Sequence, residues 1–166
     1  MTNGKEVEES LRIVPVVECF IKKGNEVLML QRSPSRKHFP NWVAGVAGKV
    51  KVGERIDEAC IREVNEETGL NIKDLQLKAI VCEILPKVEL LIFIFTAKFE
   101  SGKLIKTREG RLFWVKIREL KSLKLAPYLK IILPQILTKE KGKITFYKFV
   151  LDESNNIISY SSSEQI

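Results

Sequence analysis

The chain has 166 residues, 45% of them apolar, and a formal net charge of +7. This length can close one sizeable core, so we expect a single domain over residues 1–166 with a flexible tail at 1–10. No stretch approaches the roughly 18 continuous apolar residues of a membrane helix, and the polar, acidic N-terminus is unlike a secretion signal. These features argue against a helical membrane protein and predict a cytoplasmic one.

The scarcity of histidine and the placement of cysteine limit the possible chemistry. His38 is the single histidine, and Cys19, Cys60 and Cys82 are widely spaced among apolar residues, so we expect reduced cysteines that serve packing. Catalysis should therefore rest on carboxylates, whose oxygens suit hard cations such as Mg2+ or Mn2+. The positive charge favours an anionic partner.

The first half of the chain predicts two strands, a loop, a further strand and a helix. Gly24 supplies the positive φ of the first hairpin, and Gly69 ends the helix. The third strand is broken by glycines, as where a backbone must approach another group closely. These elements cover residues 11–21, 26–32, 33–41, 42–50 and 55–68.

The second half predicts a hairpin, a connection, a strand, a helix and a final hairpin. The first hairpin turns at Pro86 and Lys87, and the helix is kinked by Pro134 and ended by Gly142. The elements cover residues 75–85 and 88–100, 101–110, 111–117, the segment from 127, and 143–152 with 156–161. Together they predict an α/β fold, a mixed sheet covered by helices, with an extra C-terminal hairpin over 143–166.

The stretch REVNEETGL, residues 62–70, concentrates acids on the predicted helix. At about 100° per residue, Glu63 and Glu67 lie within roughly 20° of Ile56 and point with the apolar arc. A solvated helix face therefore does not explain them, and a buried unpaired carboxylate is costly. Arg62 can neutralise one carboxylate, but a divalent cation can meet several, and the glycine-containing strand before the helix could add a backbone carbonyl.

These residues carry a resemblance to a known family. From Gly48 the chain runs through five residues to Glu54, then through seven residues to REVNEETGL. This matches every defined position of the Nudix box, G-x5-E-x7-R-E-U-x-E-E-x-G-U, where U is apolar. The chain thus resembles the Nudix hydrolase superfamily, in particular its nucleoside triphosphate and 8-oxo-dGTP diphosphatases.

The resemblance implies a Nudix-type α/β/α sandwich over residues 11–138, and Mg2+- or Mn2+-dependent hydrolysis of the pyrophosphate linkage of a nucleoside diphosphate derivative. It makes Gly48, Glu63, Glu66 and Glu67 the metal ligands, with one glutamate assisting as base. Arg62 would hold the glutamates in position, and Glu54 would support them by hydrogen bonding.

Further candidates lie outside the defined box positions. Glu109, in TREGRLFWV, resembles the additional acid that relatives take from a loop; the alternative is an ordinary loop acid. Arg32 could face a phosphate, or lie simply at the surface, and Lys51 could alter the charge near the phosphates. Phe39, Trp42 and Trp114 could stack on a base, although core packing is the more frequent role of such residues.

Three functions compete. The favoured one converts a nucleoside triphosphate, oxidised or not, to monophosphate and pyrophosphate. The second is an ADP-ribose or dinucleoside polyphosphate pyrophosphatase, because Pro86 stands 16 residues after the box; a hairpin turn also explains this proline. The third is a catalytically silent nucleotide- or RNA-binding regulator, against which the complete set of box glutamates argues.

The expected partner is thus a nucleotide, with nucleic acid less favoured. The C-terminal hairpin offers a pairing edge for a homodimer.

Overall fold

The computed structural model describes residues 12–138 and 142–164, so the predicted tail at 1–10 lies outside the described residues. Within them are nine strands, two α-helices and one 3-10 helix. In chain order these are β1 (Arg12–Lys23), β2 (Glu26–Arg32), β3 (Val43–Ala44), β4 (Val46–Lys49), α1 (Ile56–Thr68), β5 (Leu70–Leu85), β6 (Val88–Gly102), β7 (Gly110–Lys116), η1 (Ile117–Ser122), α2 (Pro127–Ile136), β8 (Thr145–Leu151) and β9 (Ile157–Glu164).

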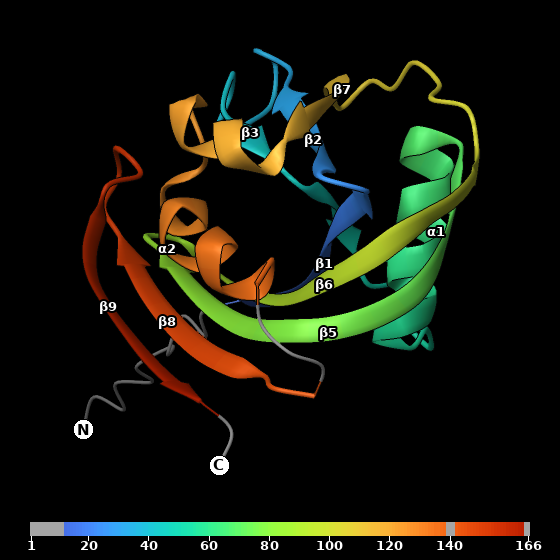
Figure 1. Cartoon of the computed structure of the whole chain (residues 1–166). Coiled ribbons are helices and arrows are strands. Elements are labelled where there is room, and N and C mark those ends of the chain that lie inside the picture. Colours follow the sequence, from blue (N-terminus) through green and yellow to red (C-terminus); the bar gives the residue numbers. More distant parts are fainter. Residues whose placement is uncertain (1–11, 139–141, 165–166) are drawn as a thin grey trace, which may run out of the picture.

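All nine strands belong to one mixed sheet. Its order is β3-β2-β1-β6-β5-β8-β9, with β4 also paired to β1 and β7 to β2. The pairs β1/β6 and β5/β8 are parallel, and the other pairs are antiparallel. Figure 1 shows the long strands curving around α2, while α1 covers the other side of the sheet. The predicted α/β fold with a mixed sheet is confirmed.

Each face of the sheet has its own apolar core. Ala59, Cys60 and Val64 of α1 pack with residues of β1, β2, β4 and β6 on one face. On the other face, α2 packs through Leu129 and Ile132 with residues of β1, β2, β5, β6 and β8. The sheet therefore separates the glutamate-bearing helix from the α2 side of the molecule.

The C-terminal hairpin extends the second core. Residues of β8 alternate between buried and accessible positions, so that Phe149 is fully buried while Phe146 is 43% exposed. Phe149 packs against Tyr128, Tyr147 and Tyr160. The strand β9 lies at the end of the sheet order, and the expected homodimer pairing there stays a prediction.

Several boundaries differ from the sequence expectation. The strand predicted over 42–50 is two short strands interrupted at Gly45, because the N–H of Gly45 turns to donate to Glu18 Oε1 at 2.8 Å. The strand expected over 75–85 begins at Leu70, because register shifts let its polar first half pair with the end of β6.

The second helix and its surroundings also differ. The helix α2 ends at Ile136 and not at Gly142. Thr138 Oγ1 donates to the carbonyl of Pro134 at 2.6 Å and so provides a hydrogen-bond donor for a carbonyl in the last turn of the helix. The short helix η1 was not expected. The cysteines are free thiols as predicted, with Cys19 and Cys60 buried. Across 12–138 and 142–164, no helix has the length and apolarity needed to cross a bilayer.

The two faces of β8 give a test of the C-terminal extension. Phe149→Ala should lower the free energy of unfolding by about 3 to 5 kcal/mol, because it leaves a cavity in the core. Phe146→Ala, on the same strand with its side chain 43% exposed, is the matched control and should cost far less. Urea unfolding followed by circular dichroism compares them, and equal losses would mean that β8 does not complete the core.

Candidate active site

Local signals fix α1 at both ends. Arg55 is the N-cap residue, and its backbone N–H donates to Glu58 at 3.0 Å. Gly69 takes the left-handed conformation with φ of 74° and donates to the carbonyl of Asn65. These ends agree with the predicted helix and set which residues of α1 meet the sheet.

Glu63 lies against β4 at Gly48. A Cβ built on Gly48 would stand 2.0 Å from the Glu63 carboxyl carbon, so only glycine leaves room for this side chain. Glu63 and Glu67 are both half-buried, as expected from the helical wheel, whereas the Glu66 side chain is 53% exposed. The fold thus brings a carboxylate directly beside the backbone of the preceding strand.

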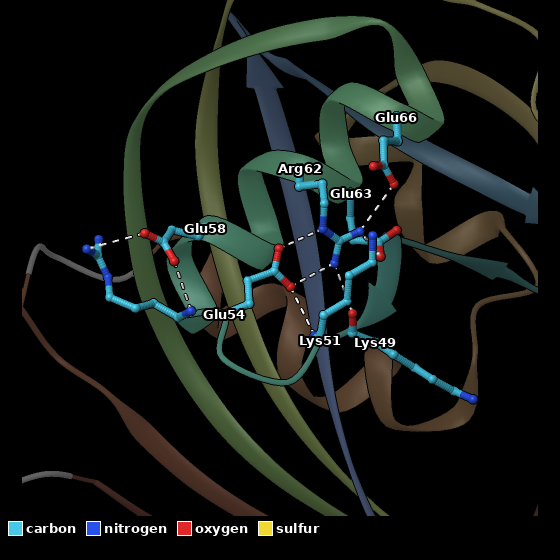
Figure 2. A network of polar contacts seen from close by, with 8 residues as sticks. Lys49, Lys51, Glu54, Glu58, Arg62, Glu63 and Glu66 are labelled. Atoms are coloured by element: carbon cyan, nitrogen blue, oxygen red, sulfur yellow. Dashed lines mark hydrogen bonds and ion pairs between the residues drawn. The ribbon is translucent and has the colours of Figure 1, made fainter.

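Arg62 is the centre of a polar network (Figure 2). Its Nε and Nη2 donate to the two oxygens of Glu54 at 2.6 and 2.9 Å. Nη1 donates to Glu63 at 2.6 Å and to Glu66 at 3.2 Å, and Nη2 also donates to the Lys49 carbonyl at 3.1 Å.

Arg62 thus contacts three acids, although its single positive charge can offset only one of them. Its Cα is on the outer side of the helix, but the long side chain turns back so that one planar guanidinium meets three acids.

The charges in this network shift the titration of its members. The hydrogen bond from Arg62 lowers the pKa of Glu54 to about 2. Burial raises the pKa of Glu63, while Arg62 acts in the opposite direction. Glu66 and Glu67 also raise the Glu63 pKa, so the repulsion expected from the sequence is present, reduced by one guanidinium.

Glu67 is tied to the loop before β7. Thr107 Oγ1 donates a short hydrogen bond to Glu67 Oε2, and the backbone N–H of Glu109 donates to Thr107 Oγ1 at 3.2 Å. Glu109 also pairs with Arg36 at 2.9 Å. The structure therefore places Glu109 near the box glutamates. The bridging Thr107 was missed, and a lone threonine in a polar loop gave no signal for it.

A cavity of about 700 Å³ opens beside these residues. Of the substrate-binding candidates, Arg32 and Phe39 line it, as do Gly48 and Glu109. Lys51 and Trp42 are not among the lining residues. Trp42 packs edge-on against Phe39, with Lys124 over its ring, and the side chain of Lys51 is exposed.

The buried part of the cavity contains two acids that sequence reasoning missed. Glu18 and Glu83 are each 1% exposed, and Tyr128 beside them is 6% exposed. Tyr128 donates to Glu18 Oε2 at 2.8 Å. A signal was present, because each acid interrupts an apolar strand, VVECF and VCEIL, at a position where a charge is costly.

The box residues have the donor chemistry of a site for a hard cation. Within the described residues no group of three or more His, Cys, Asp or Glu side chains is arranged to hold a metal, because Glu63 and Glu66 turn to Arg62 and Glu67 to Thr107. Each of these bonds uses one carboxylate oxygen. Carboxylate and backbone carbonyl oxygens are the ligands that Mg2+ prefers. At Gly48 the absence of a Cβ leaves room for the Glu63 carboxylate beside the backbone.

Comparison with known proteins places the chain in a family. Residues 12–136 match the family model described as NUDIX domain. An uncharacterized Nudix hydrolase of Bacillus subtilis, YvcI, is 31% identical over 118 residues, covering 68% of this chain and 72% of that protein. The NAD-capped RNA hydrolase NudC of Yersinia enterocolitica is 33% identical over 93 residues, and the match spans only 34% of its length.

Solved structures agree with the fold. The mutator MutT protein of Bacillus halodurans superposes with a TM-score of 0.80 at 28% identity, covering 90% of this chain and 97% of that one. A MutT protein of Methanosarcina mazei superposes with a TM-score of 0.67 at 20% identity over 76% of this chain. With its complete box carried on α1 and β4, the chain belongs to the Nudix family and is a pyrophosphohydrolase.

Proposed function

We propose that the protein hydrolyses a nucleoside triphosphate to the monophosphate and pyrophosphate with Mg2+, or Mn2+, as cofactor. The observation that carries this proposal is the cavity, which joins the box residue Gly48 to a set of cationic side chains. Those cations are Arg12, Arg32, Arg36, Lys37, Lys49 and Lys87. Such a rim suits a polyphosphate, and the volume suits a small-molecule ligand.

The metal ligands in this proposal are the carboxylates of Glu63, Glu66 and Glu67 with the carbonyl of Gly48. When bound, the ion neutralises charge on the phosphates and lowers the pKa of the attacking water. Arg62 positions Glu63 and Glu66 before the substrate arrives, so that less reorganisation is needed during reaction.

The remaining residues bind and orient. Arg32 is held by its Nε donating to the His38 carbonyl at 2.8 Å, which leaves the rest of its guanidinium for a phosphate. A water oxygen forms a new bond to phosphorus as one P–O anhydride bond breaks, and one water proton passes to a carboxylate of the site. Glu109, whose carboxylate pairs with Arg36 and whose N–H donates to Thr107 Oγ1, lies at the cavity to assist this transfer.

A second candidate is cleavage of a pyrophosphate that joins two larger groups, as in ADP-ribose, a dinucleoside polyphosphate or the cap named for the NudC relatives. Pro86 is in the β5–β6 turn, which agrees with its explanation as a hairpin-turn residue. Its neighbour Lys87, however, lines the cavity. The same turn could therefore contact the second group of such a substrate.

A substrate panel ranks these candidates. With Mg2+, the purified protein should release pyrophosphate from one or more nucleoside triphosphates, including 8-oxo-dGTP, and a chelator should stop the reaction. Chromatography of the products is the measurement. Turnover of ADP-ribose or NAD with inert triphosphates would reverse the ranking, and RNA retained at high salt without any turnover would favour a regulator.

The metal role of the glutamates has a readout besides activity. Mg2+ should raise the melting temperature, because a ligand that binds only the native state stabilises it. The double variant Glu63→Gln, Glu67→Gln should lose this rise, and Glu67→Gln alone should lower kcat on the order of 10²- to 10⁴-fold. Glu119→Gln, an exposed acid on η1, is the control. An unchanged Mg2+ response in the double variant would contradict the assignment.

Gly48 tests the contact between β4 and α1. Gly48→Ala should displace the Glu63 carboxylate and lower kcat/KM by about 100-fold, because misplacements near 1 Å are that costly. Gly53→Ala is the matched control. Its φ of 81° strains alanine, but the added Cβ would meet nothing within 4 Å, so it should lose stability and keep activity. Steady-state kinetics measure kcat/KM and thermal melts measure stability for both variants. Equal kcat/KM values for the two variants would contradict the role of the Gly48 contact.

A further inference from the structure

The buried acids of the cavity come from different strands and have different partners. Glu18, on β1, accepts from the Gly45 N–H and from the Tyr128 hydroxyl, so both of its oxygens join the sheet to α2. Glu83, on β5, has an oxygen, Oε1, that finds no hydrogen-bond partner among residues 12–138 and 142–164. Glu18 thus has a structural explanation, whereas Glu83 has none.

A buried polar atom without a hydrogen-bond partner lowers the free energy of unfolding. A side chain with a purely structural role is therefore not expected to contain one. Glu83 is 1% exposed and is among the residues that line the cavity, and its unpaired Oε1 is hidden from bulk water. Leucine at this position would remove the cost, since burying an unpaired polar group destabilises the native state. The acid is therefore more simply explained by recognition than by stability.

The charge and polarity of the lining residues change from the mouth of the cavity to its buried end. Its exposed rim is cationic, its walls include Val14, Val16, Leu90, Ile92 and Phe39, and its buried end carries the two acids. A nucleotide has the matching sequence of parts, with anionic phosphates, flat apolar ring faces and a hydrogen-bonding ring edge. A nucleotide is the ligand of this cavity under the proposed function, on which the inference below rests.

We propose that Glu83, together with Glu18, determines base specificity by hydrogen-bonding a guanine-type edge, on which a carbonyl oxygen stands next to a ring N–H and an amino group. The Glu83 carboxyl donates to the carbonyl oxygen and accepts from the ring N–H. Glu18 uses remaining lone pairs to accept from the amino group, since each carboxylate oxygen has about two acceptor positions. An adenine edge has no amino group beside its ring nitrogen on that side, and leaves Glu18 without this bond.

The protonation of Glu83 supports the assignment. Burial, and then the negative charge of Glu18, raise the pKa of Glu83 to about 8, while Arg32 opposes the shift. Tyr128 is the other titratable group facing it from α2, and its pKa is raised by burial and then by Glu18 and Glu83. The cross-strand neighbours of Glu83 are Leu90 on β6 and Phe149 on β8, which carry no charge. Near neutral pH the Glu83 carboxyl therefore holds the proton that it donates.

Binding of nucleoside monophosphates tests the proposal without requiring turnover. Isothermal titration calorimetry should give GMP at least about tenfold tighter binding than AMP, because a mismatched edge leaves buried polar groups unpaired. IMP, which lacks the amino group, should bind about as weakly as AMP, because it too leaves Glu18 without this bond. Glu83→Leu should lose the preference, while Glu83→Gln, whose amide still offers a donor and an acceptor, should keep part of it. Glu89→Gln, on the same hairpin and away from the cavity, should behave as the parent.

Other outcomes separate this inference from the proposed function. Equal affinity for GMP and AMP, or a GMP preference that survives Glu83→Leu, would overturn it. Glu67→Gln should lose turnover and keep the preference. If no nucleotide is hydrolysed while a Glu83-dependent GMP preference holds, the hydrolytic proposal fails and the base assignment stands.

Stability gives an independent readout of Glu83. Glu83→Leu should unfold at no lower denaturant concentration than the parent. Its advantage should grow as pH rises from 4.5 towards 8, because the unfolded chain releases a proton that the folded parent retains on Glu83. A large loss of stability at all pH values would show a structural role and contradict the proposal.

Discussion

The guanidinium of Arg62 makes the concentration of acids on α1 tolerable. It contacts Glu54, Glu63 and Glu66 and the Lys49 carbonyl, and so joins the helix, the loop before it and the end of β4. Without this group, Glu63 would be a half-buried carboxylate facing two like charges. One cation does not balance several carboxylates, however, so the site keeps an excess of negative charge, which is the electrostatic condition for receiving a divalent ion.

The pairing of β1 with β4 places the two halves of the site on opposite faces of one sheet. Val17 pairs with Gly48, and Glu18 pairs with Ala47. Successive side chains of a strand point to opposite faces. Val17 therefore packs in the core under α1, while Glu18 enters the cavity on the α2 side. A shift of one residue in this register would exchange the two faces and separate Gly48 from Glu63.

The parts of the site that could be predicted from the sequence are those encoded by local spacing. The 23 residues from Gly48 to Leu70 carry a helix start, a glycine stop and the acids at fixed intervals, and these places are as expected. Glu18 and Glu83 lie 65 residues apart and line the same cavity because β1 and β5 both pair with β6. No periodicity encodes such a meeting, although a glutamate within an apolar strand marks each position.

Other differences have the same origin in tertiary contacts. The break between β3 and β4 depends on a bond from Gly45 to Glu18, and the bridge from Glu67 to Glu109 depends on Thr107 in a loop without regular structure. Trp42 matched a stacking role by type but packs against Phe39. Side-chain type and local pattern therefore predict the chemistry of the box, whereas the shape of the cavity follows from pairing between distant segments.

The distribution of charge in the cavity constrains how a substrate can enter it. Cationic side chains gather at the exposed rim, and two acids occupy the buried end. A polyphosphate entering first would meet like charge at Glu18, whereas a base entering first would leave its phosphates beside the cations and Gly48. For the nucleotide substrate proposed above, this gradient favours the orientation that brings the pyrophosphate to Gly48, where β4 meets α1.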